Sequence, residues 1–146
     1  MLKPMTKEHI SAVAEIERLC FSEPWSETAL AESLDSPYAR FFVYEDGRVM
    51  GYMGMYTVAG EGSVTNVATH PDCRRMGVAL ALVENSVKIG RELGLEYITL
   101  EVRESNLPAI SLYEKCGFRV MGKGKSFYSS PKEDAIIMNC FFDSKD

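Results

Sequence analysis

After a short opening strand, the first periodic pattern in the chain is that of a helix. Thr6 belongs to the residue types that cap helices, and the apolar residues after it recur every three positions. These residues are Ile10, Val13, Ile16 and Leu19. The spacing predicts an amphipathic helix that buries this stripe against a core.

A second helix is predicted to begin after Ser26. Serine is a favoured N-cap residue, and Trp25 before it can pack against Leu30 in the first turn as a hydrophobic staple. The segment Asp35-Ser36-Pro37 is predicted to end this helix, because a proline does not continue a helix that precedes it.

An antiparallel meander is predicted next. Residues 40–58 contain two runs of strand-forming residues separated by Asp46-Gly47, a pair that favours a type I′ hairpin turn. A turn at Gly60-Glu61-Gly62 leads into a further strand over residues 63–70, which ends before Pro71. The first half of the chain is therefore predicted to form two helices and then a meander.

The second half begins with another helical pattern, over residues 77–94. Its apolar positions are Leu80, Val83, Val87 and Leu93, and Gly94 fits the C′ position. Residues 95–102 follow as a strand with two distinct faces. Ile98, Leu100 and Val102 lie on one face, and Tyr97, Thr99 and Glu101 on the other.

A last helix is predicted between its N-cap Asn106 and Gly117, with Pro108 in its first turn. Residues 118–124 and 134–142 then form a closing strand pair. The strand–helix–strand order in the middle of the chain requires a parallel pair, so the sheet is mixed. We expect a single α+β domain over residues 1–146, with a mixed, mostly antiparallel sheet flanked by about four helices.

Composition narrows the class of protein. The chain has 146 residues, of which 46% are hydrophobic and 25% charged, and its net charge of −5 disfavours a nucleic-acid binder. It has no apolar run of about 20 residues and no signal-like N-terminus, so we expect a cytoplasmic protein without a membrane segment. The four cysteines lie far apart, without a CxxC pair and with only two histidines in the chain, which indicates reduced thiols and no metal site.

The junction before residue 77 has the chemistry of an anion site. A predicted strand is followed by Arg74 and Arg75, and Gly77 and Ala79 then begin a helix. A helix N-terminus offers free N–H groups and a partial positive charge, and small residues let a phosphate approach them. The segment matches neither the P-loop pattern nor G-x-G-x-x-G. The alternative is a plain helix start with two solvated arginines.

Three residues further along carry possible chemistry. Glu101 lies near the end of its strand, away from the apolar face, and Asn106 and Tyr113 are seven residues apart, two turns along one helix face. Glu101 can alternatively pair with Arg103, Asn106 can be an ordinary N-cap, and Tyr113 can be a core aromatic. Sequence spacing alone leaves these alternatives open.

Taken together, the segments resemble the GCN5-related N-acetyltransferase (GNAT) family. Arg74, Gly77 and Ala79 match its motif A, Gln/Arg-x-x-Gly-x-Gly/Ala between a strand and a helix, and the element order is similar over essentially the whole chain. The branch that it resembles most is the RimI-like ribosomal-protein-alanine N-acetyltransferases. The matching stretches are "PWS" at 24–26, "LEVRESN" at 100–106, "AISLYEKCGF" at 109–118 and "EDAIIM" at 133–138.

The resemblance implies a GNAT fold, acetyl-CoA as co-substrate and a set of site residues. It implies that Glu101 accepts a proton from the amine, that Tyr113 protonates the departing sulfur and that Asn106 holds the CoA arm. The implied acetyl-CoA contacts are Val67, Ala68, Thr69, Arg74, Arg75, Met76, Gly77, Val78, Ala79 and Leu80, besides Asn106. The implied acceptor groove lies between two loops, at Trp25 and Ser26 on one side and Phe127 and Tyr128 on the other.

We therefore expect an acetyl-CoA-dependent enzyme that acetylates the N-terminal α-amine of a protein, namely a ribosomal protein beginning with alanine. Phe127 stands where many relatives have a second tyrosine, and Lys125 is the nearest cation, which leaves the preference for a peptide open. The alternatives are a transferase for a small amine, such as a polyamine, amino acid or antibiotic, and a non-catalytic acyl-CoA-binding module. The sequence leaves the oligomeric state open.

Overall fold

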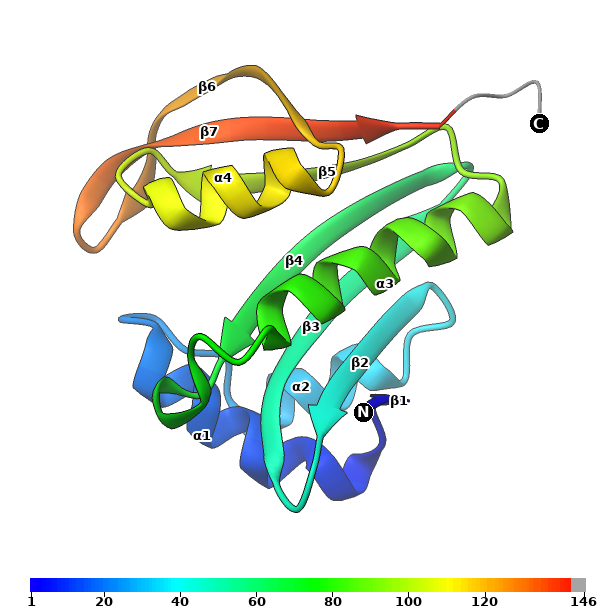
Figure 1. Ribbon diagram of the computed structural model, residues 1–146. Helices are drawn as coiled ribbons and strands as arrows, with labels where there is room; N and C mark the ends of the chain where they lie inside the picture. The colour runs from blue at the N-terminus through cyan, green and yellow to red at the C-terminus, as the bar shows by residue number, and fades with distance from the viewer. Residues whose placement is uncertain (143–146) are drawn as a thin grey trace.

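The structure, a computed structural model, describes residues 1–142 and contains seven strands and four α-helices (Figure 1). The strands are β1 (Leu2–Pro4), β2 (Ala39–Glu45), β3 (Val49–Val58), β4 (Glu61–Thr69), β5 (Tyr97–Arg103), β6 (Arg119–Ser129) and β7 (Lys132–Phe141). The helices are α1 (Ile10–Cys20), α2 (Glu27–Leu34), α3 (Val78–Leu93) and α4 (Leu107–Lys115), with short 3-10 helices at Lys7–His9 and Pro71–Cys73.

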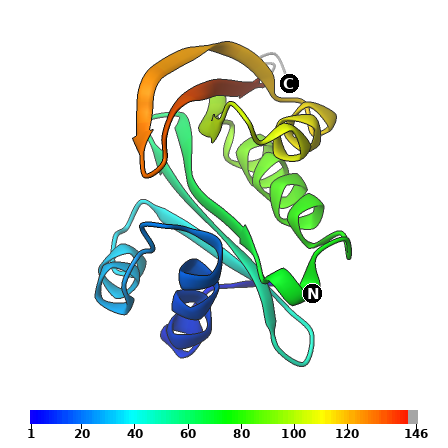
Figure 2. The ribbon, with the colours of Figure 1, turned by 90° about the vertical axis from the view of Figure 1, so that its left-hand side faces the viewer.

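All seven strands form one sheet in the order β1-β2-β3-β4-β5-β7-β6. The β4–β5 pair is parallel and the other neighbouring pairs are antiparallel. Helices α1 and α2 cover one face of the sheet, and α3 and α4 cover the other (Figure 2). The predicted α+β class, the meander and the mixed, mostly antiparallel sheet are confirmed.

Each face of the sheet has its own hydrophobic core. Under α1 and α2 the core includes Val13 and Leu30, which are fully buried, and Ile16, which is 1% exposed. Under α3 and α4 it is built around Leu82, Val83, Ile98, Leu100 and Met138. The predicted caps at Ser26 and Gly94 form, because Ser26 Oγ accepts from the Ala29 N–H at 3.1 Å and the α3 helix ends at Gly94 with a left-handed φ of 69°. Thr6 instead precedes the 3-10 helix Lys7–His9, and α1 begins only at Ile10.

Two apolar residues that were predicted to face the core are exposed. Leu19 is 51% exposed and Leu93 is 44% exposed. A helix turns by about 100° per residue, so a strict three-residue spacing drifts and places Leu19 about 180° around α1 from Ile10. By the same geometry Leu93 lies about 120° around α3 from Val87. Val78 and Leu82, which the prediction omitted, are buried on α3 instead.

The two hairpin connections differ from the prediction: the first is a three-residue loop, and the second is the tight two-residue turn. Glu45 pairs with Val49 across the three-residue loop of residues 46–48, in which only Gly47 has a positive φ, so the predicted type I′ turn is wrong here. The second connection is tighter than predicted: Ala59 and Gly60 both have positive φ, 52° and 83°, as a type I′ turn requires, and β4 already begins at Glu61.

The feature that shapes the site is the separation of β4 from β5. The two strands pair only from Glu61 to Ser63, and the rest of β4 pairs with β3 alone. A bulge follows at once, because Met55 pairs with Val64 and Gly54 with Asn66, which leaves Thr65 as an extra residue. Bulges bend the strand that carries them. Beyond the bulge β4 and β5 diverge, and each presents an unpaired backbone edge to the space between them (Figure 1).

Candidate active site

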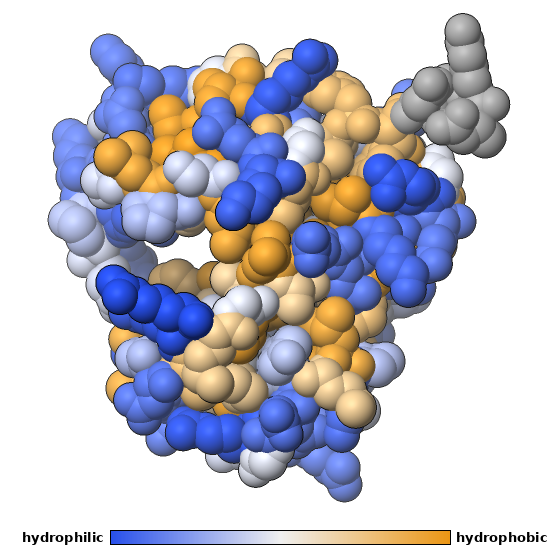
Figure 3. Space-filling view, viewed as in Figure 1, coloured by the Kyte–Doolittle hydropathy of each residue, from blue (hydrophilic) through white to orange (hydrophobic). Residues whose placement is uncertain are grey.

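A cleft opens where β4 and β5 separate. It consists of two adjoining cavities of about 590 Å³ and 490 Å³ that share Cys20, Phe21, Val67 and Asn106 in their walls. In the space-filling view the molecule is hollowed between its upper and lower parts (Figure 3). We call the larger cavity, at the start of α3, the cradle, and the smaller one, between β4, β5 and the α1–α2 and β6–β7 loops, the reaction pocket.

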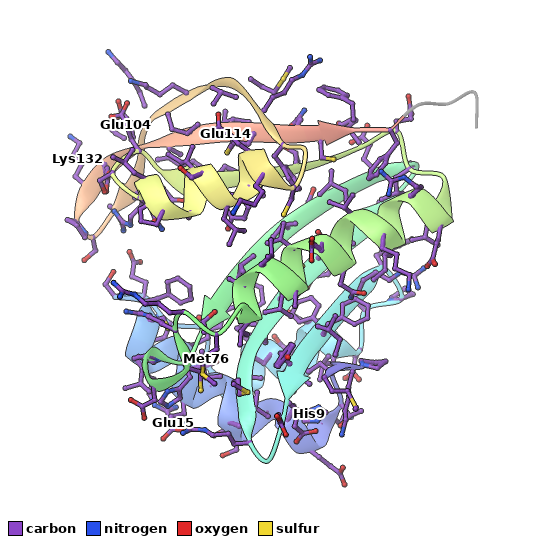
Figure 4. The ribbon with its side chains drawn as sticks, in the orientation of Figure 1. His9, Glu15, Met76, Glu104, Glu114 and Lys132 are labelled. Carbon is purple, nitrogen blue, oxygen red and sulfur yellow. The ribbon has the colours of Figure 1, made fainter. Side chains whose placement is uncertain are left out.

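Nearly all of the predicted acetyl-CoA contacts line the cradle. These are Val67, Ala68, Thr69, Arg74, Arg75, Gly77, Val78, Ala79, Leu80 and Asn106. Met76 does not line it: this residue is 60% exposed and lies in the loop before α3, where Figure 4 labels it. The opposite wall comes from α4, whose Pro108, Ala109 and Leu112 are apolar.

The cradle suits a phosphate beside an apolar chain. The first backbone bond of α3 runs from Ala81 to the Gly77 carbonyl at 3.0 Å, so the preceding N–H groups of Val78, Ala79 and Leu80 belong to the unpaired first turn. Gly77 has a φ of 78°, and a Cβ on it would meet no atom within 4 Å. The backbone is therefore directly accessible, and the exposed guanidinium groups of Arg74 and Arg75 add positive charge.

The reaction pocket brings together the two predicted catalytic residues. Glu101 from β5 and Tyr113 from α4 line it, along with Trp25, Asn106 and Tyr128. Glu101 is exposed at the wall of this pocket, and its partial desolvation there raises the pKa of its carboxyl above the ordinary value of 4.5, which makes its carboxylate a stronger base.

Tyr113 lies deeper in the same pocket. Its side chain is 8% exposed, and its ring packs against Phe118 with centroids 5.9 Å apart. Burial, together with smaller contributions from the nearby Tyr128 and Cys116, raises the pKa of its hydroxyl to about 12. The hydroxyl is thus protonated throughout the neutral range. Asn106 begins α4 as predicted, with its Oδ1 accepting from the Ala109 N–H at 3.3 Å.

Arg103 holds the β6–β7 hairpin over the pocket. Its guanidinium donates to the carbonyls of Ser130 and Pro131 at 3.1 Å and 2.8 Å and lies over the Tyr128 ring, 4.3 Å from its centroid. It also forms an ion pair with Glu133 at 3.2 Å. The predicted alternative, in which Arg103 pairs with Glu101, is therefore not the arrangement found. Arg103 therefore orients the hairpin and does not pair with the Glu101 carboxylate, which lines the pocket.

The α1–α2 loop and the β6–β7 hairpin meet at one side of the pocket. Ser129 Oγ donates to Glu23 Oε1 at 3.0 Å, and Ser22 Oγ donates to the Ser130 carbonyl. Figure 4 labels Lys132 and Glu104 beside this hairpin, across the open space from Met76. The two loops therefore bound the pocket on the side away from the cradle.

The four predicted acceptor residues are not all in this pocket. Trp25 and Tyr128 line it, whereas Ser26 lines a neighbouring shallow hollow with Pro24 and Tyr56, and Trp25 belongs to the walls of both. Phe127 is 56% exposed and packs edge-on against Tyr128, with ring centroids 5.1 Å apart. The structure thus brings two of these residues to the cleft and leaves Ser26 and Phe127 outside it.

A buried polar network beneath the pocket was absent from the sequence-based prediction. Glu17 of α1 is 1% exposed and accepts hydrogen bonds from Tyr52, from Asn66 and from the Trp25 N–H. A sequence signal existed, because Glu17 follows Val13 by four residues and so falls on the buried stripe of α1. Nothing local pointed to Asn66 and Tyr52.

The remaining polar candidates have structural roles. His70 is buried and its Nδ1 accepts from the Asp72 N–H at 3.0 Å, whereas His9 at the start of α1 is half-buried. Burial raises the pKa of the Cys20 thiol, which donates to the Thr69 carbonyl at 3.2 Å. Within residues 1–142, no three His, Cys, Asp or Glu side chains are grouped for a metal ion. In the same range, none of the helices combines the length and apolar character needed to cross a membrane.

The chain is similar in sequence to known acetyltransferases. The profile of the Acetyltransferase (GNAT) family matches residues 10–118. A Bacillus subtilis (strain 168) protein, whose name provisionally gives it ribosomal protein bS18-alanine N-acetyltransferase activity, is 37% identical, with 94% of this chain and 92% of that protein covered. The ribosomal protein bS18-alanine N-acetyltransferase of Escherichia coli (strain K12) is 33% identical, with 88% of each chain covered.

The fold is shared as well. The crystal structure of the ribosomal-protein-S18-alanine N-acetyltransferase from Escherichia coli superposes with a TM-score of 0.89 at 29% identity. The superposition covers 97% of this chain and 92% of that one.

Proposed function

The chain belongs to the acetyltransferase (GNAT) family, and we propose that it transfers the acetyl group of acetyl-CoA to the N-terminal α-amine of a ribosomal protein that begins with alanine. The observation that carries this proposal is the joining of the cradle to a pocket that holds both a carboxylate and a protonated tyrosine. The named activity of the relatives supports the choice of acceptor.

The residues of the cradle fit acetyl-CoA. The first-turn amides of α3 with Arg74 and Arg75 would hold the pyrophosphate, and the unpaired edge of β4 at residues 67–69 would bond the pantetheine amides. When bound there, acetyl-CoA supplies the activated acyl group and a thiol leaving group. The apolar α4 wall excludes water from this arm of the cleft.

In the reaction pocket, one residue of this chain would accept a proton from the amine and another would donate a hydrogen bond to the sulfur. Glu101 takes a proton from the attacking amine, directly or through one water, because its carboxylate is the base form above its raised pKa. The Tyr113 hydroxyl donates to the sulfur as negative charge develops on it. Glu101 lies on β5 and Tyr113 on α4, so the two residues can contact the amine and the sulfur at the same time.

An α-amine is the acceptor that suits a single carboxylate base. Its pKa near 7.7–8.0 lies about 2.5 units below that of a lysine side chain, so freeing it at neutral pH is easier by roughly 3.4 kcal/mol. This difference favours a protein N-terminus over a lysine. It does not by itself separate a peptide from a small amine of similar pKa, so the acceptor has to be tested directly.

The acceptor test compares peptides with free amines. One acceptor is a peptide that reproduces an alanine N-terminus of a ribosomal protein. We expect its kcat/KM to be at least about tenfold above the values for spermidine, for free amino acids and for a peptide whose only free amine is a lysine. Release of the CoA thiol, followed with a thiol reagent, measures all of them on one scale. A small amine that exceeds every peptide would replace the proposed function with the small-amine alternative.

Gly77→Leu tests the cradle. Acetyl-CoA should raise the melting temperature of the wild-type protein, since a ligand that binds only the folded state stabilises it by mass action. The leucine side chain would occupy the open space beside the first-turn amides, so the variant should lose that rise. Thermal unfolding with and without acetyl-CoA measures the effect.

Gly94→Leu is the matched control for this experiment. Gly94 ends the same helix with a similar φ of 69°, and a Cβ there also meets no atom within 4 Å. Both variants therefore carry a similar cost of a left-handed leucine, on the order of 1 kcal/mol. Gly94→Leu should keep the acetyl-CoA shift, and an equal shift in Gly77→Leu would show that the cradle does not hold the phosphates.

A further inference from the structure

Asn66, in the wall of the reaction pocket, has a buried hydrogen-bond acceptor without a partner among the described residues. It follows the bulge residue Thr65 on β4, its side chain is 8% exposed, and it lines the pocket with Glu101 and Tyr113. Its Nδ2 donates to Glu17 Oε2 at 3.2 Å. Its Oδ1 is buried without a hydrogen-bond partner among the described residues.

The Glu17 carboxylate fixes which way the Asn66 amide points. The NH2 group is the donor half of the amide, and it is the half that faces Glu17, because Asn66 Nδ2 lies within hydrogen-bond distance of Glu17 Oε2. The Tyr52 hydroxyl and the Trp25 N–H, at 2.8 Å, also donate to Glu17 and hold the carboxylate in place. The amide oxygen of Asn66 is therefore turned away from the network.

A buried acceptor without a partner is costly, and such atoms are rare in folded proteins. In a substrate pocket the cost is recovered when the bound molecule supplies an N–H or O–H group. The same arrangement gives specificity, because an analogue that lacks the donor leaves the acceptor unpaired. A donor on the acceptor substrate would satisfy Asn66 Oδ1 in this way.

We propose that Asn66 Oδ1 accepts a hydrogen bond from the first main-chain amide N–H of the acceptor peptide. This inference rests on the proposed function, in which the α-amine gives its proton toward Glu101. Glu101 lies on β5 and Asn66 on β4, the two strands that separate to form the cleft. The next donor along the peptide backbone is the N–H of its second residue, and many small amines have no equivalent group.

The test is a comparison of two substrates in two enzymes. One substrate is an alanine-initiated peptide of the ribosomal type, and the other is its ester analogue, in which an oxygen replaces the first amide N–H. The wild-type enzyme should use the ester about tenfold less well in kcat/KM, as expected when a buried acceptor loses its donor. The Asn66→Ala variant should show at most about a twofold difference, because the acceptor oxygen is gone.

The comparison separates a substrate contact from a structural role. A purely structural Asn66 would lower both kcat/KM values alike and leave their ratio at the wild-type value, which would overturn the inference. Thr65→Val is the control, since Thr65 lines the same pocket with its hydroxyl on the Gly54 carbonyl at 3.3 Å, and it should keep the wild-type ratio. Asn66→Leu, which has nearly the shape of asparagine and also lacks the acceptor oxygen, replaces Asn66→Ala if that variant does not fold.

The outcome also distinguishes this inference from the proposed function. If the enzyme acetylates the peptide with an unchanged ester penalty in Asn66→Ala, the inference fails and the function stands. If neither alanine-initiated substrate is used while spermidine is, the proposed function fails and the inference with it. The unchanged KM for acetyl-CoA in Asn66→Ala is expected as well, because Asn66 does not line the cradle.

Discussion

Replacing Tyr113 with phenylalanine should lower turnover by about 10²–10⁴-fold while leaving the affinity for acetyl-CoA nearly unchanged. The variant keeps the ring that packs against Phe118 and removes only the hydroxyl. With a pKa of about 12, that hydroxyl stays protonated at every pH at which the protein is assayed, so the loss should be constant from about pH 6 to 9. Steady-state kinetics across that range, with acetyl-CoA affinity measured separately, give both quantities.

The raised pKa also defines what Tyr113 can do. An ordinary thiol has a pKa near 8.5. Complete proton transfer to its thiolate from a hydroxyl of pKa about 12 is therefore unfavourable by about 3.5 pKa units. The hydroxyl is therefore most effective as a hydrogen-bond donor whose strength grows as charge builds on the sulfur. Burial strengthens that interaction and keeps competing water away.

A second tyrosine provides the control for this variant. Tyr97 packs against Phe141 at the far end of β5, outside the cleft, so Tyr97→Phe should retain wild-type turnover. If Tyr113→Phe keeps more than about half of the wild-type activity, Tyr113 is a core aromatic residue and another group serves the sulfur.

Most of the fold could be predicted because its signals are local. N-cap residues, the glycines after α3 and α4, and strand alternation in β5 each act within a few residues, and the elements they predict are present. The errors arise where geometry accumulates over distance. Leu19 follows Ile16 by three residues and Leu93 follows Val87 by six, both multiples of three, and only the angle summed around the helix places them in solvent.

The turns show a related limit of local signals. Asp46-Gly47 has the stronger turn signal, yet a bulge beside Glu45 lengthens that connection to three residues. Ala59-Gly60 carries a weaker signal and forms the tight turn, because the register of β3 on β4 requires two residues in the left-handed region. Strand register is a property of the sheet, and no short window of sequence contains it.

The site divides in the same way. Glu101, Asn106 and Tyr113 lie within thirteen residues of one another, and the anion motif is continuous, so both could be recognised in the sequence. The network of Glu17, Tyr52 and Asn66 joins α1, β3 and β4, whose residues come together only after the sheet forms. The bulge at Thr65 is what turns Asn66 toward α1 and at the same time separates β4 from β5.

Replacing Glu101 with glutamine should remove most activity near neutral pH, by about 10²–10⁴-fold, the usual contribution of a general base. Some activity should return as the pH rises, because the acceptor amine then loses its proton unaided. For an α-amine the neutral fraction rises from about 0.14 at pH 7 to about 0.94 at pH 9, so the variant's rate should rise about sevenfold and then level off. For a lysine acceptor the rate should still be rising about tenfold per pH unit at pH 9.

The stability of the same variant separates loss of a base from loss of structure. Burial raises the folded-state pKa of Glu101, so its carboxylate costs stability above that pKa and the neutral form is the one that folding favours. Glu101→Gln should therefore melt no lower than the wild type at pH 7, while Glu104→Gln, a solvent-facing residue nearby on the chain, should keep normal activity. Wild-type turnover in Glu101→Gln at pH 7 would assign the base to another group. A wild-type kcat/KM that is higher for the lysine peptide than for the α-amine would show that the acceptor is a side chain.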